Sequence, residues 1–158
     1  MLDLERRCSN TAHWSQQLYE GLFHSDTERP RRLVLVIDKA AGDGEHGSKS
    51  GEFKSAESPM LGFLVANQIG ADWELENIVV APAFRRKGLA TRLLHALLTR
   101  ACETKSESVF LEVRQSNQAA RALYGRQGFE ESGRRTGYYA NPEEDAVLYR
   151  LTLRPLSR

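Results

Sequence analysis

The sequence has few cysteines, no long apolar run and no surplus of charge of one sign. Its 158 residues include only Cys8 and Cys102, whose spacing fits neither a metal-ligand set nor a disulfide framework. That usage is typical of a reducing compartment. No apolar run approaches the roughly 18 residues of a membrane-spanning helix, and the charged segment 3–7 lacks the apolar core of a secretory signal. We therefore expect a cytoplasmic protein without a membrane partner.

The charge is balanced, with 22 Lys and Arg residues against 21 Asp and Glu residues. A chain without a global positive field gives no reason to expect nucleic acid as a partner. Nor does the sequence predict a metal site. Its length suits one domain with a substantial core, so we predict a single domain over residues 1–158 and take a monomer as the default.

The apolar pattern predicts strands that alternate with helices, after a weakly patterned segment 1–12. Helices are expected after the N-cap Ser15, with Leu18 and Tyr19 on one face, and over about 87–104 and 117–127. Strands are expected over 33–37, 61–68, 73–80, 109–113 and 147–153, with another after 128–129. Residues 40–58 are rich in Gly, Ser and charge, which predicts a mobile insertion between two antiparallel strands. The fold class is therefore α/β.

The stretch 78–94, IVVAPAFRRKGLATRLL, predicts a site for an anion. A β-branched strand ends before Pro82, and the basic segment Arg85-Arg86-Lys87-Gly88 leads into a helix. The unpaired N–H groups and partial positive charge of a helix start suit a phosphate, and Gly88 would let it approach the backbone. Taken alone, the motif is also compatible with a basic turn before an ordinary surface helix.

A second stretch, 111–129, reads LEVRQSNQAARALYGRQGF. Glu112 interrupts an apolar strand, where an ionised carboxylate is costly unless it is partnered or functional. Asn117 can cap the following helix, which carries Tyr124. From these residues alone, Glu112 could instead be structural and paired with Arg114 or Arg121.

Both stretches resemble one family. Arg-x-x-Gly-x-Ala at 85–90 is similar to the pyrophosphate loop of the GNAT N-acetyltransferases. The stretch 111–129 is similar, nearly residue for residue, to enzymes that acetylate protein N-termini, including the bacterial ribosomal-protein-alanine N-acetyltransferases (RimI type) and the catalytic subunits of archaeal and eukaryotic N-terminal acetyltransferases. Residues 138–146, YYANPEEDA, and 13–15, HWS, also resemble segments of these enzymes. The likeness runs from about 13 to 153 and is weakest over 23–60.

The resemblance implies the GNAT fold, a mixed, strongly curved sheet of about six or seven strands flanked by helices. The sequence departs from the family in two places. The usual first strand and part of the first helix have no obvious counterpart before His13, so either the start is trimmed or this branch does without that strand. The 40–58 insertion is also longer than a hairpin needs.

The resemblance also implies the chemistry. Acetyl-CoA would be the cosubstrate, without a covalent acetyl-enzyme, which leaves both cysteines as bystanders. Glu112 would be the base, acting through water, and Tyr124 would protonate the departing sulfur. Glu76 is the alternative base, because many members of the wider superfamily carry a carboxylate just before the cofactor strand; otherwise it would meet the substrate amine.

Two further sets of residues follow from the resemblance. Tyr138 and Tyr139 fall in the family's peptide-binding loop, where one of them would line the substrate mouth; packing against the last strand is the simpler alternative. The cofactor would contact Ile78, Val79, Val80, Arg85, Arg86, Lys87, Gly88, Leu89, Ala90, Thr91, Asn117 and Ala119.

The implied acceptor is the N-terminus of a ribosomal or other cytoplasmic protein, foremost the N-terminal alanine of small-subunit ribosomal protein eighteen. The first alternative is a broader N-terminal or small-amine acetyltransferase. The second is a non-catalytic acyl-CoA-binding or ribosome-associated module.

Overall fold

The computed structural model describes residues 1–8, 14–22, 32–39 and 59–153. The predicted insertion 40–58 lies outside these ranges. The elements are α1 (Leu2–Arg6), α2 (Gln16–Gly21), β1 (Arg32–Asp38), β2 (Met60–Ile69), β3 (Asp72–Val80), the 3₁₀ turn η1 (Pro82–Phe84), α3 (Leu89–Glu103), β4 (Ser108–Arg114), α4 (Gln118–Arg126), β5 (Glu130–Ala140) and β6 (Glu143–Thr152).

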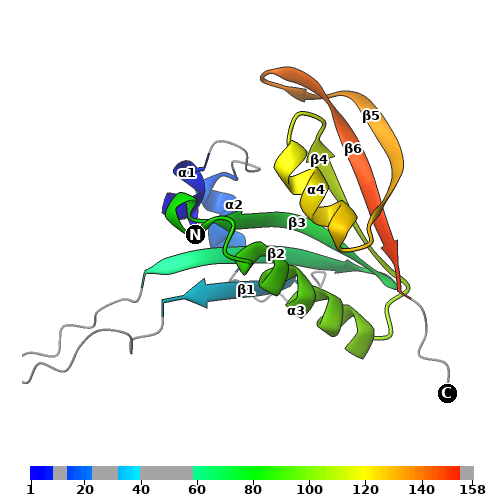
Figure 1. Cartoon of the computed structure of the whole chain (residues 1–158), viewed down its shortest axis with the longest axis horizontal. Coiled ribbons are helices and arrows are strands. Elements are labelled where there is room, and N and C mark those ends of the chain that lie inside the picture. The colour runs from blue at the N-terminus through cyan, green and yellow to red at the C-terminus, as the bar shows by residue number, and fades with distance from the viewer. Residues whose placement is uncertain (9–13, 23–31, 40–58, 154–158) are drawn as a thin grey trace, which may run out of the picture.

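The strands form one six-stranded sheet in the order β1-β2-β3-β4-β6-β5 (Figure 1). Every neighbouring pair is antiparallel except β3 and β4, which are parallel. The predicted mixed α/β sheet is therefore confirmed. Among the described residues before Arg32 there are two short helices and no strand. Helix α1 was not predicted.

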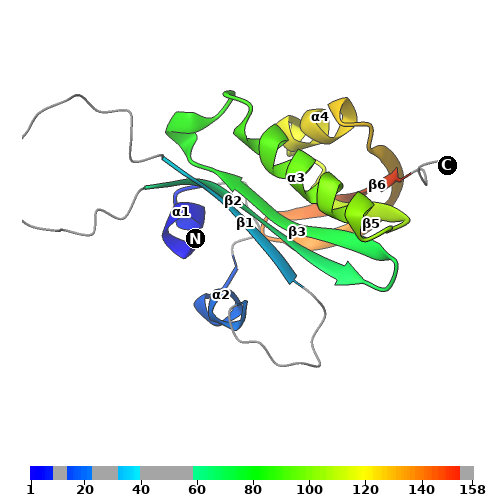
Figure 2. The same cartoon turned by 90° about the horizontal axis from the view of Figure 1, so that it is seen from below.

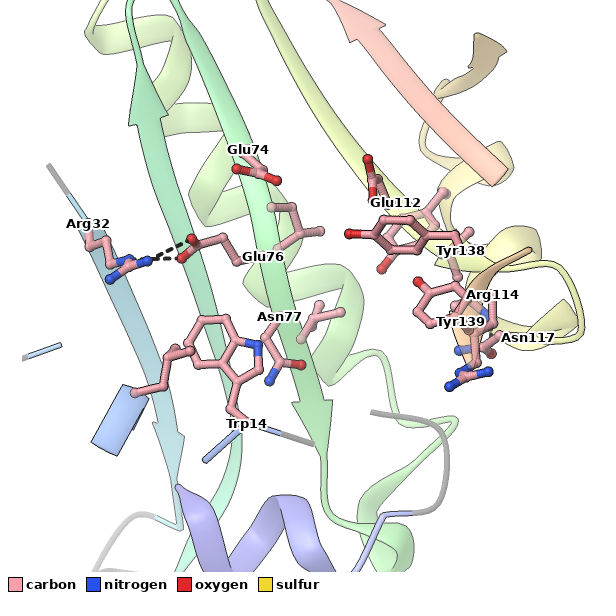
Figure 3. A pocket seen from close by; sticks show the side chains of 16 residues that line it. Trp14, Arg32, Glu74, Glu76, Asn77, Glu112, Arg114, Asn117, Tyr138 and Tyr139 are labelled. Atoms are coloured by element: carbon pink, nitrogen blue, oxygen red, sulfur yellow. Dashed lines mark hydrogen bonds and ion pairs between the residues drawn. The ribbon is translucent and has the colours of Figure 1, made fainter. Parts of the chain in front are cut away.

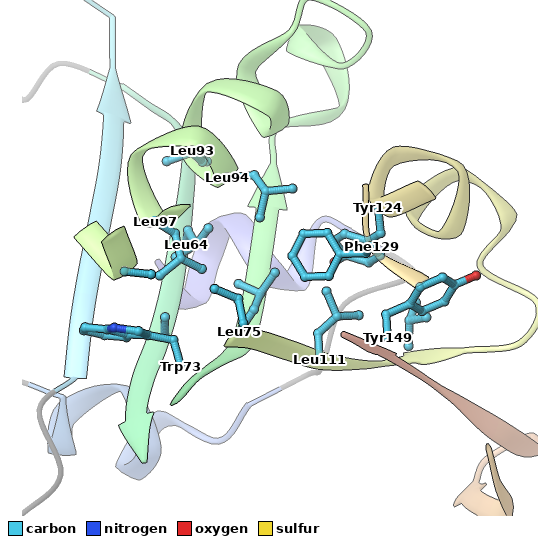
Figure 4. Close-up of a cluster of buried hydrophobic side chains, with 14 of the residues drawn as sticks. Leu64, Trp73, Leu75, Leu93, Leu94, Leu97, Leu111, Tyr124, Phe129 and Tyr149 are labelled. Carbon is cyan, nitrogen blue, oxygen red and sulfur yellow. The ribbon is translucent and has the colours of Figure 1, made fainter. Parts of the chain in front are cut away.

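The helices cover the two faces of the sheet, with α3 and α4 on one face and α1 and α2 on the other (Figure 2). Strand β2 is apolar on both of its faces because helices cover both faces of the sheet. Leu64 and Ala66 pack toward α3, whereas Phe63 and Val65 pack with α1 and α2. The larger core lies on the α3 side and continues beneath α4 (Figure 4). Its fully buried members include Leu64, Leu94, Leu97, Val109 and Val147.

The parallel strands β3 and β4 separate partway along their length. They pair only from Asp72 opposite Ser108 to Leu75 opposite Leu111, although β3 runs on to Val80 and β4 to Arg114. Beyond Leu75 the sheet therefore opens between its two central strands, while β4 stays paired with β6. Figure 1 shows β4, β5 and β6 diverging from the other strands.

A β-bulge in β3 sits at this opening. Val65 of β2 pairs with Asn77 and Ala66 pairs with Leu75, so Glu76 has no partner in that ladder. A bulge reverses the alternation of side chains beyond it. Leu75 accordingly packs in the core beneath α3, whereas Val79 packs with α1 and α2. The bulge thereby brings Asn77 to the side of the strand that carries Glu74 and Glu76.

Candidate active site

Two cavities meet at the opening of the sheet. The larger, of about 720 Å³, lies along the end of β3, the turn before α3 and one side of α4. It contains Arg85, Arg86 and Arg126, and we call it the basic cavity. The smaller, of about 430 Å³, contains Glu74, Glu76 and Glu112, and we call it the acidic cavity. Ile78, Asn117, Ala120 and Tyr124 line both.

The basic cavity gathers nearly all of the predicted cofactor residues. Those that line it are Ile78, Val79, Val80, Arg85, Arg86, Gly88, Leu89, Ala90, Thr91, Asn117 and Ala119. Lys87 does not line it, and its ammonium lies over the Phe84 ring, 5.1 Å from the ring centre. Phe84, Leu123 and Arg126 line the cavity but were not predicted, since no motif spacing marks them.

The turn before α3 leaves the start of that helix open. Gly88 is the N-cap residue with a left-handed φ of 78°, and no side chain caps the helix. Arg86 also has a left-handed φ, of 60°. Two left-handed residues delay the helix until Leu89, two residues after its predicted start. The first N–H groups of α3 are therefore without a side-chain acceptor, which suits an anionic group in the cavity.

The acidic cavity is built from both halves of the sheet (Figure 3). Glu76 accepts two hydrogen bonds from Arg32, each of 3.0 Å. Glu112 pairs through Oε1 with Nε of Arg135 at 3.2 Å. Neither Arg114 nor Arg121 is the partner of Glu112, which corrects that structural alternative. These two arginines pair with Glu144 at 3.3 Å and Glu131 at 3.8 Å.

Glu74 is a third carboxyl group in the acidic cavity, and the sequence did not single it out. Among the described residues it has no ion pair or hydrogen bond with another side chain, unlike Glu76 and Glu112. Burial raises the pKa of Glu74, and the neighbouring charges of Glu76 and Glu112 raise it further. The signal in the sequence was its position two residues before Glu76, which places both on one face of a strand.

Tyr138 and Tyr139 lie in strand β5 and not in a loop, which corrects their predicted setting. The ladder with β6 is irregular between Arg135 and Tyr139, so these consecutive tyrosines both line the acidic cavity. The Tyr139 ring packs under Arg114, 4.0 Å from its guanidinium carbon. Tyr138 is 50% exposed, and the nearby charge of Glu112 raises the pKa of its hydroxyl.

Tyr124 stands where the two cavities meet. Its ring is buried against Phe129 and Tyr149, with centroid distances of 5.8 and 6.2 Å. Burial raises the pKa of its hydroxyl well above the usual value, so the group stays protonated at neutral pH and can donate. Asn117 begins α4 as predicted, and its Oδ1 accepts from the Ala120 N–H at 3.2 Å. Its carbonyl oxygen is therefore engaged in the cap.

The described residues hold no cluster of His, Cys, Asp and Glu side chains suited to a metal ion. None of their helices is long and apolar enough to cross a membrane.

A sheet opened between two parallel strands, with a basic turn and an uncapped helix start beside the opening, is the arrangement of an α/β acyltransferase. Comparison with known proteins agrees, since residues 3–129 match the model of the acetyltransferase (GNAT) family. The chain belongs to that family.

Particular relatives are similar over much of the chain. The [ribosomal protein bS18]-alanine N-acetyltransferase of Salmonella typhimurium is 37% identical over 101 residues, which cover 63% of this chain and 68% of that protein. The crystal structure of the ribosomal-protein-S18-alanine N-acetyltransferase from Escherichia coli superposes with a TM-score of 0.72 at 26% identity, covering 96% of this chain and 84% of the other. Arabidopsis thaliana NAA60, solved with a bisubstrate analogue, has a TM-score of 0.74 at 16% identity over 96% of this chain and 89% of the other, a likeness of fold.

Proposed function

We propose that this protein transfers the acetyl group of acetyl-CoA to the α-amine at the N-terminus of another protein. The observation that carries the proposal is that a basic and an acidic cavity meet at Tyr124. The basic cavity suits the phosphates of coenzyme A, because it combines arginines with an uncapped helix start. The acidic cavity suits an arriving ammonium group. Where the cavities join, an amine could meet a thioester.

The residues at the junction can perform the transfer. A protein α-amine has a pKa of about 8, so at neutral pH it must lose a proton before its nitrogen attacks. Glu112 would accept that proton through water. As the nitrogen–carbon bond forms, the carbon–sulfur bond of the thioester breaks, and the Tyr124 hydroxyl would protonate the leaving sulfur. The nitrogen would lose its second proton to water as the amide forms, and a proton from water would restore the Tyr124 hydroxyl. Backbone groups of 78–80 would polarise the carbonyl during the attack.

The ion pairs support Glu112 over Glu76 as the base. Both carboxylate oxygens of Glu76 accept from Arg32, whereas Arg135 contacts one oxygen of Glu112. Glu112 also lies on the strand that faces Tyr124 of α4, in the same cavity. Glu76 would then order the cavity wall or meet the arriving amine.

The acceptor that the relatives favour is the N-terminal alanine of small-subunit ribosomal protein eighteen, modified in the cytoplasm. Tyr138 and Tyr139 form an aromatic border of the acidic cavity, which suits a small first residue followed by an extended chain. A broader N-terminal or small-amine acetyltransferase would keep the same chemistry with other acceptors.

The test is release of free thiol from acetyl-CoA with a peptide that begins Ala-Arg-Tyr, compared with the same peptide carrying a blocked amine. We expect turnover with the free amine alone. Glu112→Gln and Tyr124→Phe should each lower kcat on the order of 10²-fold or more, the range of general acid–base catalysis. Tyr149→Phe is the matched control, because this neighbouring tyrosine also loses a hydroxyl but lines neither cavity.

Three other outcomes would change the assignment. Loss of activity in Glu76→Gln but not in Glu112→Gln would move the base to Glu76. Equal turnover of small amines and peptides would favour the broader enzyme. Binding of acetyl-CoA without acetylation of any amine would favour the non-catalytic module.

A further inference from the structure

A buried carboxyl group lies behind the wall of the acidic cavity. Glu5 of α1 is only 1% exposed. Its Oε1 accepts from Nδ2 of Asn77 at 2.8 Å, and its Oε2 accepts from the backbone N–H of Trp14 at 3.0 Å. Burial and the nearby charge of Glu5 raise the pKa of the Tyr19 hydroxyl well above its usual value. A glutamate is almost never fully buried unless it is partnered, and here donors from two separate segments, Asn77 of β3 and the Trp14 backbone, converge on one group.

The partners of Glu5 belong to the wall itself or support it. Asn77 follows the bulge of β3, and both Asn77 and Trp14 line the acidic cavity. Tyr19 supports Trp14 from behind, with ring centroids 5.5 Å apart, and packs edge-on against Phe63 at 6.0 Å. Its hydroxyl accepts from Nδ2 of Asn77 at 3.3 Å. Figure 3 shows Trp14 beside Asn77 at the edge of the cavity.

We propose that Glu5 is a positioning residue that holds Trp14 against β3 and so shapes the acceptor side of the site. Glu5 lines neither cavity, and its partners Trp14 and Asn77 line the acidic cavity and not the basic one. Its influence therefore falls on the acceptor peptide and not on acetyl-CoA. The inference rests on the proposed function for the identity of the acceptor. The hydrogen bonds from Trp14 and Asn77 to Glu5 are independent of that function.

Glu5→Gln is the variant that tests the proposal. The two donors approach different oxygens of Glu5, and glutamine has an NH₂ group in place of one of these oxygens, so one buried donor loses its acceptor. We expect the KM of the Ala-Arg-Tyr peptide to rise about fivefold to tenfold, the effect of about one lost hydrogen bond. The kcat and the KM of acetyl-CoA should stay within about twofold. Asp3→Asn is the matched control, because this carboxylate of the same helix is 88% exposed and, within the described part of the chain, pairs with Arg7 alone.

Hydrogen–deuterium exchange of the Trp14 amide gives a readout without substrate. The N–H bonded to Glu5 should exchange at least tenfold faster in Glu5→Gln than in the wild type, and at the wild-type rate in Asp3→Asn. If Glu5→Gln does not fold, Tyr19→Phe replaces it. That variant keeps the ring but removes the hydroxyl, and should shift both readouts in the same direction by a smaller factor.

The outcomes separate cleanly. Unchanged exchange at Trp14, or faster exchange with an unchanged peptide KM, would overturn the positioning role. A parallel rise in the KM of peptide and acetyl-CoA would also overturn it. If the wild type acetylates no peptide, the proposed function fails, while exchange at Trp14 still shows whether Glu5 holds this segment.

Discussion

The three carboxyl groups of the acidic cavity differ in what surrounds them. Glu76 is held by two hydrogen bonds from Arg32 and Glu112 by one ion pair with Arg135. Glu74 has no such partner among the described residues, and burial with two like charges nearby raises its pKa. An ionised Glu74 therefore costs the folded protein stability, as is common for groups kept for function.

Glu74→Gln should reveal this cost through its dependence on pH. Because the pKa of Glu74 is higher in the folded state, its contribution to stability is fully present below the unfolded pKa, near 4.5, and is lost as pH rises through the folded pKa. Glutamine is neutral at every pH, so the variant should melt roughly 1–3 °C above the wild type at pH 7. The difference should shrink toward pH 4.

Melting curves between pH 4 and pH 8 measure the effect. The control is Glu103→Gln, which removes an exposed carboxylate of α3 outside both cavities. A melting temperature that is lower at pH 7 in Glu74→Gln than in the wild type would show that Glu74 stabilises the fold.

Among the elements, the turn before α3 depends most on one backbone conformation. At Gly88 a φ of 78° is accessible to glycine but strained for other residues, although a Cβ there would meet nothing within 4 Å. Gly88→Ala should therefore lower stability by about 1 kcal/mol. It should also raise the KM of acetyl-CoA severalfold, because the first N–H groups of α3 would move.

Gly133→Ala provides the comparison for this substitution. Gly133 of β5 also has open space around a Cβ but no left-handed φ, so its stability and KM should stay near the wild-type values. Equal effects of the two substitutions would mean that the backbone conformation at Gly88 is not the cause.

The sequence predicted the elements better than their irregularities. Apolar runs marked β2, β3, β4 and β6, and Asn117 and Ser15 marked two helix starts. The bulge at Glu76 and the irregular ladder near Tyr138 were missed, because they depend on the register between strands and not on the bulged strand alone. For the same reason, nothing in the sequence predicted that Trp14, Arg32 and Glu74 would share a cavity with Glu112, since four separate segments supply them.

At the scale of the whole molecule, stability depends on the place where the two parts of the sheet join. Leu111 is 1% exposed and forms the last pair between β4 and β3, opposite Leu75. Leu111→Ala should leave a cavity there and cost about 2–5 kcal/mol, which corresponds to a fall of roughly 5–15 °C in melting temperature.

Ile69→Ala is the control for Leu111→Ala, because Ile69 of β2 is 47% exposed. Its substitution should lower the free energy of unfolding by less than about 1 kcal/mol. Thermal melts or urea titrations measure both variants. A loss at Leu111 no larger than at Ile69 would mean that the junction does not limit the stability of the fold.

The extra residue at Glu76 also bears on how such a protein can diverge. The bulge exists because β3 has one extra residue, Glu76, between Leu75 and Asn77. This extra residue determines which face of the sheet each later side chain of β3 occupies. If the proposed function holds, substitutions around the acidic cavity would alter the preferred acceptor and leave intact the junction of the two cavities at Tyr124. A one-residue deletion would instead exchange the two faces of the strand beyond it, and would change the residues that β3 contributes to both cavities in a single step.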